Sequence, residues 1–145
     1  KMENTDDLAL LIHFYQCAHK IHHAQKYPGQ GRILTLLLEN GMMTQRELIT
    51  ITGRRSATLS EQLENMEHTG YITRKRNEQD KRNVDVTLTK SGIAAAEDAV
   101  KFREALSHDL FDEFSEEDKK QFDLLLERML HMLRCRETES EDMQQ

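Results

Sequence analysis

Basic side chains form three short clusters in the middle of the chain: Arg54-Arg55, Arg74-Lys75-Arg76 and Lys81-Arg82. Guanidinium and ammonium groups bind phosphate through their charge and their several N–H donors, so such clusters suit the backbone of a nucleic acid. Clusters of this kind also occur on ordinary solvated surfaces, where they contribute little. The elements that carry the clusters must decide between the two interpretations.

The charge balance is uneven along the sequence. The 145 residues have a formal net charge of −6, which by itself argues against a nucleic-acid partner. Residues 32–92 hold ten basic and eight acidic side chains, a net charge of +2, while the rest hold ten basic and 18 acidic ones, a net charge of −8. The acidic excess thus lies outside the segment with the basic clusters and does not oppose DNA binding there.

Four side chains near the N-terminus are candidates for sensing a metal, an oxidant or another small molecule. His19, His22 and His23 stand at i, i+3 and i+4 of a predicted helix, so His19 could share a zinc ion with either neighbour. We favour histidines that are either solvated or stabilise the helix C-terminus as partial cations, because no carboxylate or cysteine stands at a matching spacing. Cys17 is interpreted as a small buried hydrophobe, with redox sensing as the alternative.

The sequence lacks the residue patterns of the common catalytic sites. It has no recognisable Ser-His-Asp arrangement, phosphate-binding glycine loop or pair of catalytic carboxylates, so we predict no enzyme, no cofactor and no metal site. No run approaches the roughly 18 apolar residues of a membrane span, and the N-terminus lacks the layout of a signal peptide. We therefore expect a cytoplasmic protein without a membrane partner.

Helical periodicity dominates the chain, which contains only six glycines and one proline. Thr44 and Glu47 have the spacing of a capping box, and Ser115 precedes a run of acidic residues that suits a helix N-terminus. Apolar residues at helical spacing predict helices over about 6–26, 32–40, 44–52 and 56–69, and two long helices that begin near residues 91 and 115.

The period changes after Gly70. Alternating residues predict strands at 71–73 and 83–88, joined by the charged loop 76–82. Two short helices joined at Gly53 and followed by this hairpin form a winged helix-turn-helix layout. The fold class that we predict is therefore mainly α-helical with a small two-stranded β-wing.

The second of the two short helices is the one expected to read DNA. Ser56 would cap it, and Leu59, Leu63 and Met66 fall on one apolar face. Since an α-helix is about 10–12 Å across, it fits the major groove, where small polar side chains reach base edges and phosphates. The opposite face carries such side chains: Thr58, Ser60, Glu61, Gln62 and Asn65.

From about residue 5 to residue 135, the chain resembles the MarR family of winged helix-turn-helix transcriptional regulators. The most specific stretch is Asp80–Gly92, DKRNVDVTLTKSG, which is similar to the family's Asp-x-Arg wing, the hydrophobic strand after it and the Leu-Thr-x-x-Gly entry into the next helix. The segment Glu67–Ile72 is similar to the exit from the family's recognition helix. The resemblance therefore covers most of the chain and includes the wing.

The resemblance implies roles for individual residues. Arg82 would be the wing-tip arginine at the minor groove, and Asp80 the acid that orients wing arginines. Glu61 stands where many members have a basic residue, which leaves the base sequence of the operator open, since a carboxylate could accept from a cytosine amino group. The residues expected at the DNA are Arg54, Arg55, Ser56, Thr58, Ser60, Glu61, Gln62, Arg74, Lys75, Arg76, Asp80, Lys81 and Arg82.

The resemblance also implies which segments of the chain dimerise and which bind DNA. Segments 5–28 and 91–135 would form a helical dimerisation region, and 32–90 the DNA-binding domain. The acidic tail 136–145 has no apolar pattern, so we expect it to be disordered. In the family's hydroperoxide-sensing branch, the reactive cysteine lies in the helix that corresponds to the one with Cys17.

The function that this implies is sequence-specific binding of double-stranded DNA at a pseudo-palindromic operator. A homodimer would place its two reading helices about one DNA turn, roughly 34 Å, apart. We expect a repressor that an unknown small-molecule or stress effector releases. Two alternatives remain: a zinc-responsive regulator that uses the histidines of the first helix, and a protein–protein interaction module without DNA binding.

Overall fold

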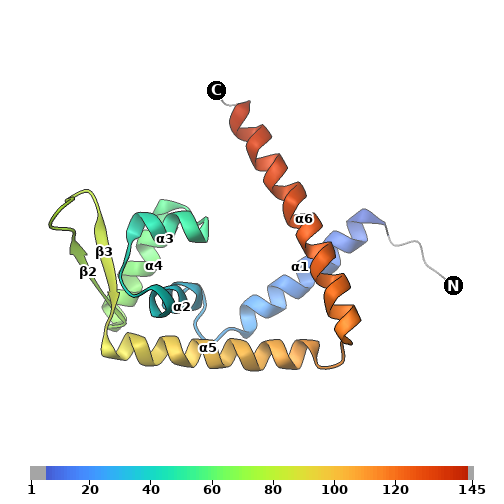
Figure 1. Cartoon of the computed structure of the whole chain (residues 1–145), viewed down its shortest axis with the longest axis horizontal. Helices are drawn as coiled ribbons and strands as arrows, with labels where there is room; N and C mark the ends of the chain where they lie inside the picture. The colour runs from blue at the N-terminus through green and yellow to red at the C-terminus, as the bar shows by residue number, and fades with distance from the viewer. Residues whose placement is uncertain (1–5, 144–145) are drawn as a thin grey trace. The chain divides into compact units, whose positions relative to one another are not determined.

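The computed structural model describes residues 6–143, and within that range it contains six helices and one small antiparallel sheet (Figure 1). The chain divides near residue 104 into two compact units, which are described separately. The predicted fold class is confirmed. The elements are α1 (Asp7–Ala24), α2 (Gly31–Asn40), β1 (Met43–Thr44), α3 (Gln45–Thr52), α4 (Ser56–Thr69), β2 (Ile72–Arg76), β3 (Val84–Leu88), α5 (Lys90–Phe111) and α6 (Glu116–Asp142).

The hydrophobic core lies in the first unit, between α2, α3, α4, the sheet and the first turns of α5. Its centre is the apolar run of α2, where Ile33 and Leu34 are fully buried, as the sequence predicts. Leu59, Leu63 and Met66 of α4 are likewise fully buried. Burying a side chain of this size stabilises the fold by about 1.5–3 kcal/mol, so three of them in one row hold the orientation of α4 firmly.

Local capping signals place the short helices. Thr44 and Glu47 form the predicted capping box at the start of α3, with the Glu47 N–H donating to Thr44 Oγ1 at 3.1 Å and the Thr44 N–H donating to Glu47 Oε2 at 2.9 Å. Gly53 ends α3 in the left-handed region, with φ 65° and ψ 12°. Gly70 ends α4 in the same way, and because glycine has no Cβ, both sharp exits are unstrained.

The sheet has three strands in the order β1-β3-β2, whereas the sequence predicts two. Strands β2 and β3 pair from Ile72↔Leu88 to Arg76↔Val84, and β1 adds the pair Met43↔Val86 on the other side of β3. A strand of two residues is too short to show an alternating pattern, which is why the sequence does not reveal β1. The added strand ties the wing to the start of α3.

A close contact joins α5 to the end of α4. Thr89 Oγ1 donates to the carbonyl of Gly70 at 2.5 Å and accepts the N–H of Gly92 at 3.0 Å. A Cβ at Gly92 would overlap the carbonyl group of Tyr71, so only glycine allows this approach. The Leu-Thr-x-x-Gly entry seen in the sequence therefore has a packing reason.

The second unit begins within α5 and contains α6. Ser115 and Asp118 form a reciprocal capping box at the start of α6, at 3.0 Å in both directions. The expectation of a disordered tail is wrong for residues 136–142, which continue α6. There Thr138 and Ser140 donate their hydroxyls to carbonyls one turn back, each at 2.8 Å, and no glycine or proline interrupts the segment. Residues 144–145 lie outside the described residues, as does residue 5 of the expected dimerisation segment.

Within residues 6–143, none of the helices combines the length and the hydropathy that crossing a membrane requires.

Candidate nucleic-acid interface

Helices α3 and α4 form a helix-turn-helix. The left-handed Gly53 turns the chain after α3, and Arg54 and Arg55 lead into α4. The prediction that Ser56 caps α4 is wrong, because Ser56 is the first helical residue and Arg55 is the N-cap. The side chain of Arg55 makes no capping hydrogen bond within the described chain. The first N–H groups of α4 are thus left for solvent or an anion, next to a guanidinium.

The outer face of α4 offers small polar groups at its N-terminal end. Ser56, Thr58 and Glu61 are exposed, and Ser60 is partly buried. The buried row Leu59, Leu63 and Met66 lies on the other side, so packing leaves the polar row outside. This division is the one that the sequence predicts. The hydroxyl groups of the polar row can donate or accept a hydrogen bond, and the carboxylate of Glu61 can only accept one.

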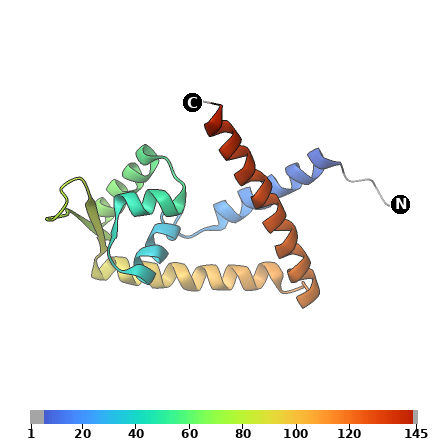
Figure 2. The same cartoon turned by 45° about the horizontal axis from the view of Figure 1, so that its top comes forward.

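The wing projects from the helices, with its strands joined by the loop 77–83 (Figures 1 and 2). Asn77 organises this loop: its Oδ1 accepts the N–H groups of Gln79 at 2.9 Å and Asp80 at 3.0 Å, and its Nδ2 donates to the carboxylate of Asp85 at 3.2 Å. The Asn77 N–H donates to the carbonyl of Asn83 at 2.8 Å and closes the loop. The tip is therefore an ordered turn.

The cations of the wing differ in how they are held. The side chain of Arg82 is 88% exposed, and its Nε lies 3.8 Å from Asp80 Oδ1. Asp80 Oδ1 also accepts the backbone N–H of Arg82 at 3.1 Å, and Arg76 donates to the Lys81 carbonyl at 3.1 Å. Lys75 and Lys81 are exposed as well. The wing thus presents several cations at one edge of the domain.

Arg74 is held against α4 instead of standing free in solvent. Its Nη2 lies 3.3 Å from Glu67 Oε1, and its Nε donates to Glu67 Oε2 at 3.4 Å. Hydrogen bonding to this guanidinium lowers the pKa of Glu67. The pair ties β2 to the last turns of α4.

Two other residues expected at the DNA contact each other. Arg54 Nη1 donates to Gln62 Oε1 at 2.6 Å and to the Gly29 carbonyl, also at 2.6 Å. Burial, together with repulsion from Arg32, lowers the pKa of Arg54. Arg54 and Gln62 are partly buried, whereas the neighbouring Arg55 is exposed. Sequence spacing cannot show this arrangement, because Gly29 lies 25 residues before Arg54.

Comparison with known proteins shows where this chain belongs. Residues 26–84 match the family model described as the MarR family. The chain is 35% identical over 94 residues to the uncharacterized HTH-type transcriptional regulator YwhA of Bacillus subtilis, covering 64% of this chain and 67% of that protein. The chain belongs to the MarR family.

Two further similarities accompany the assignment. This MarR-family chain is 40% identical over 74 residues to the organic hydroperoxide resistance transcriptional regulator of Bacillus subtilis, covering 51% of this chain and 50% of that protein. Its structure resembles that of Staphylococcus aureus MepR in a complex with DNA, with a TM-score of 0.76, 27% identity, and coverage of 83% and 94% of the two chains. The family consists of winged helix-turn-helix transcriptional regulators and not of enzymes, as predicted.

The candidate sensor residues of this MarR-family chain lie on α1. Cys17, His19, His22 and His23 are all exposed, so the expectation of a buried Cys17 is wrong for the isolated chain. The rings of His19 and His23 have centroids 4.2 Å apart in an edge-to-face contact. Among the described residues, no three metal-binding side chains gather at one point.

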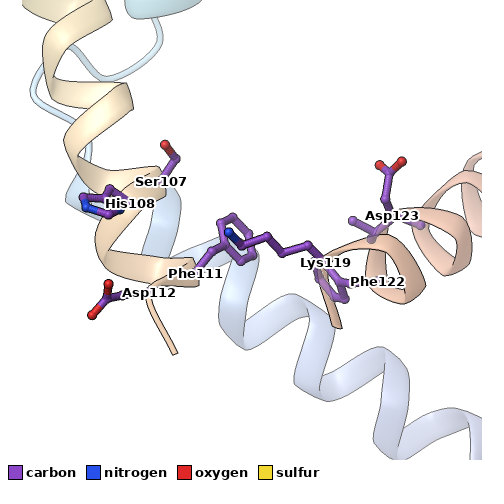
Figure 3. Close-up of a pocket in the computed structure, with 8 residues that line it drawn as sticks. Ser107, His108, Phe111, Asp112, Lys119, Phe122 and Asp123 are labelled. Atoms are coloured by element: carbon purple, nitrogen blue, oxygen red, sulfur yellow. The ribbon is translucent and has the colours of Figure 1, made fainter. Parts of the chain in front are cut away.

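A pocket of about 540 Å³ in the second unit is a feature that sequence reasoning missed. Phe111, Phe122 and Leu126 supply its apolar wall, and charged groups surround it. The centroids of the two phenylalanine rings lie 6.2 Å apart. Figure 3 shows the labelled side chains around the pocket: Ser107, His108 and Phe111 on α5, Asp112 directly after it, and Lys119, Phe122 and Asp123 on α6.

Proposed function

We propose that this MarR-family regulator binds double-stranded DNA sequence-specifically as a homodimer and represses transcription until an effector releases it. The observation that carries the proposal is the polar outer face of α4, which begins at an N-terminus without a side-chain cap and lies in the same domain as a basic wing. Such a helix presents N–H groups and hydroxyls to phosphates and base edges together. The complex of MepR with DNA supports the same mode of binding for this chain.

The proposed DNA contacts fall into two groups. In the first, α4 lies in the major groove, and its exposed Ser56, Thr58 and Glu61 meet bases and phosphates, with Ser60 at their edge. The exposed Arg55 at the N-cap of α4 neutralises a phosphate beside them. In the second, the exposed wing cations Lys75, Arg76, Lys81 and Arg82 neutralise backbone phosphates or enter the minor groove, and Asp80 orients Arg82.

Dimer formation is supported by two helices whose apolar residues find no cover in the chain. Neither α1 nor α6 has a buried residue, although α1 carries Leu8, Leu11, Ile12 and Tyr15 with exposed fractions of 43–65%. A contiguous apolar stripe of this kind marks a protein–protein contact. The aromatic pocket beside Phe122 belongs to the same proposal, since a second copy would cover it.

The proposed domain division follows from these contacts. Residues 32–90 form the DNA-binding domain, and 5–28 together with 91–135 form the dimerisation region. An effector that favours dimers with a different spacing of the two α4 helices would release the operator by a population shift. The effector itself stays unassigned.

Selection of bound fragments from genomic DNA, followed by fluorescence-anisotropy titration of a selected fragment, tests the proposal. We expect a pseudo-palindromic motif and an affinity that falls steeply with salt, because bound phosphates release counterions. Failure to enrich any fragment, with a folded dimer in hand, would contradict DNA binding and favour a protein-interaction module.

A zinc titration tests the remaining alternative, a zinc-responsive regulator. A zinc-responsive regulator would release the operator at stoichiometric zinc, and His22→Ala with His23→Ala would abolish that release. Because no cluster of three metal-binding side chains forms among residues 6–143, we expect neither effect.

A further inference from the structure

The two arginines before α4 are adjacent in sequence but differ in what they touch. Arg55 is exposed at the N-cap. Arg54 is partly buried and donates from one nitrogen, Nη1, to both Gly29 O and Gln62 Oε1. Each of these hydrogen bonds is 2.6 Å long, and the positive charge of the donor strengthens both. Arg54 therefore joins α4 to the turn between α1 and α2.

The turn fits closely against the side chain of Gln62. Gly29 has φ +74°, and a Cβ at this position would lie 2.7 Å from Gln62 Nε2. With any larger residue at this position, the amide group of Gln62 would have to shift. The backbone of the turn and the side chain of α4 are thus in direct contact, and Arg54 bridges them.

The same turn is fixed on its other side to α5. Tyr27 OH donates to Asp98 Oδ2 at 2.7 Å, and Lys26 Nζ lies 2.6 Å from the same oxygen. The ring of Tyr27 also makes an edge-to-face contact with Tyr71, which follows α4, at a centroid distance of 6.3 Å. The position of α4 is in this way tied to the turn after α1 and, through it, to α5.

We propose that Arg54 is a positioning residue for the DNA-reading helix and neutralises no DNA phosphate. Arg54 makes one hydrogen bond to Gln62 on α4 and one to the Gly29 carbonyl, and together they hold that helix against the turn at Gly29. The inference rests on the proposed function of α4. Desolvation of the guanidinium fits this role, because a phosphate-binding arginine needs open access to the DNA backbone.

The salt dependence of operator binding distinguishes positioning from phosphate contact. Each neutralised phosphate contributes about −0.9 to the slope of log K against log salt concentration. Arg54→Met keeps the side-chain stem and removes the charge, so we expect about tenfold weaker operator binding with an unchanged slope. Arg55→Met is the matched control. Because each of the two subunits of the proposed dimer would lose one phosphate contact, we expect the slope to become less negative by about two units.

A second readout reports the geometry of α4. Loosening the helix lowers the ratio of operator affinity to affinity for a scrambled sequence, which loss of a phosphate contact leaves nearly unchanged. Gln62→Leu removes the acceptor and keeps both arginines. We therefore expect it to reproduce the weaker binding, the lower ratio and the unchanged slope, and to add little to Arg54→Met in the double variant.

Two results would overturn the inference. One is a slope that changes with Arg54→Met as it does with Arg55→Met, and the other is an unchanged operator affinity in both Arg54→Met and Gln62→Leu. If Arg54→Met fails to fold by circular dichroism, Gln62→Leu alone carries the test. Absence of salt-dependent DNA binding in the wild-type dimer would instead overturn the proposed function.

Discussion

At the scale of single residues, exposure separates the cations that can meet DNA from those that hold the domain together. Arg82 has an 88% exposed side chain and one distant ionic neighbour, Asp80. Arg74, with a side chain only 22% exposed, is bound to Glu67. Both are arginines within one hairpin, but only Arg82 can leave its contact at little cost, since a surface ion pair contributes between nothing and 1 kcal/mol.

Arg82→Ala should weaken operator binding about tenfold and leave thermal stability nearly unchanged, because a wing-tip arginine supports no core. Anisotropy titrations and a thermal melt measure the two quantities. Arg74→Ala serves as the contrast, with a lower melting temperature expected from the loss of the pair with Glu67. Operator affinity unchanged in Arg82→Ala would remove this residue from the interface.

At the scale of elements, the turn after α1 is held by one carboxylate. Asp98 accepts from Lys26 and from Tyr27, and these two hydrogen bonds lower the pKa of Asp98. The same contact, helped by burial, raises the pKa of Tyr27 to about 12. Asp98 therefore stabilises the fold above its ordinary pKa of about 3.9, and this contribution is lost as the pH falls through the lowered value.

The contribution of Tyr27 to stability is lost as the pH rises, whereas that of Asp98 is lost as the pH falls. The stabilisation by Tyr27 is complete below pH 10.0 and is lost as the pH rises toward about 12. In a titration of tyrosinate absorbance, we expect one of the three tyrosines to ionise near pH 12. Tyr27→Phe should remove that step, and Asp98→Asn should return it toward pH 10.0.

Tyr15→Phe is the matched control, since Tyr15 is exposed on α1, and it should leave the late step in place. If the ionisation near pH 12 persists in Tyr27→Phe, Asp98 does not raise the pKa of the Tyr27 hydroxyl. Circular dichroism at each pH establishes that the titrated protein is folded.

At the scale of the whole molecule, the described chain combines a hydrophobic core with a large exposed apolar surface. The core belongs to the first unit, whereas α1 and α6 expose leucines and aromatic rings along their length. The homodimer that we propose would bury these stripes. The acidic excess of the chain also belongs to the residues outside 32–92.

Leu11→Glu should convert the dimer into a monomer, because a charge in a buried apolar contact costs several kcal/mol. Operator affinity should fall about 100-fold or more, since the second reading helix no longer binds as part of the same molecule. Light scattering after size-exclusion chromatography measures the mass. Gln16→Glu adds the same charge to the same helix at a polar position and should remain dimeric, whereas a dimeric Leu11→Glu would exclude this face of α1.

Local signals were sufficient for the helices of this protein and for the hairpin of β2 and β3. The capping boxes at Thr44 and Ser115, the glycines that end α3 and α4, and the alternating residues of β3 each act within a few positions of the chain. Hence the sequence alone predicted the six helices, the wing and the polar outer face of α4. Its resemblance to the MarR family rested on the same local patterns, and the family comparison confirmed it.

Tertiary structure alone decided which polar side chains are held by a distant segment of the chain. Arg54 and Arg55 are identical in type and adjacent, yet Arg54 turns to Gly29, and Tyr27 finds a partner in Asp98, 71 residues further along the chain. The two-residue strand β1 likewise exists only because β3 lies beside it. Contacts between segments so far apart leave no periodic trace in the sequence, because periodicity reports one element's faces and not the neighbour that each face meets.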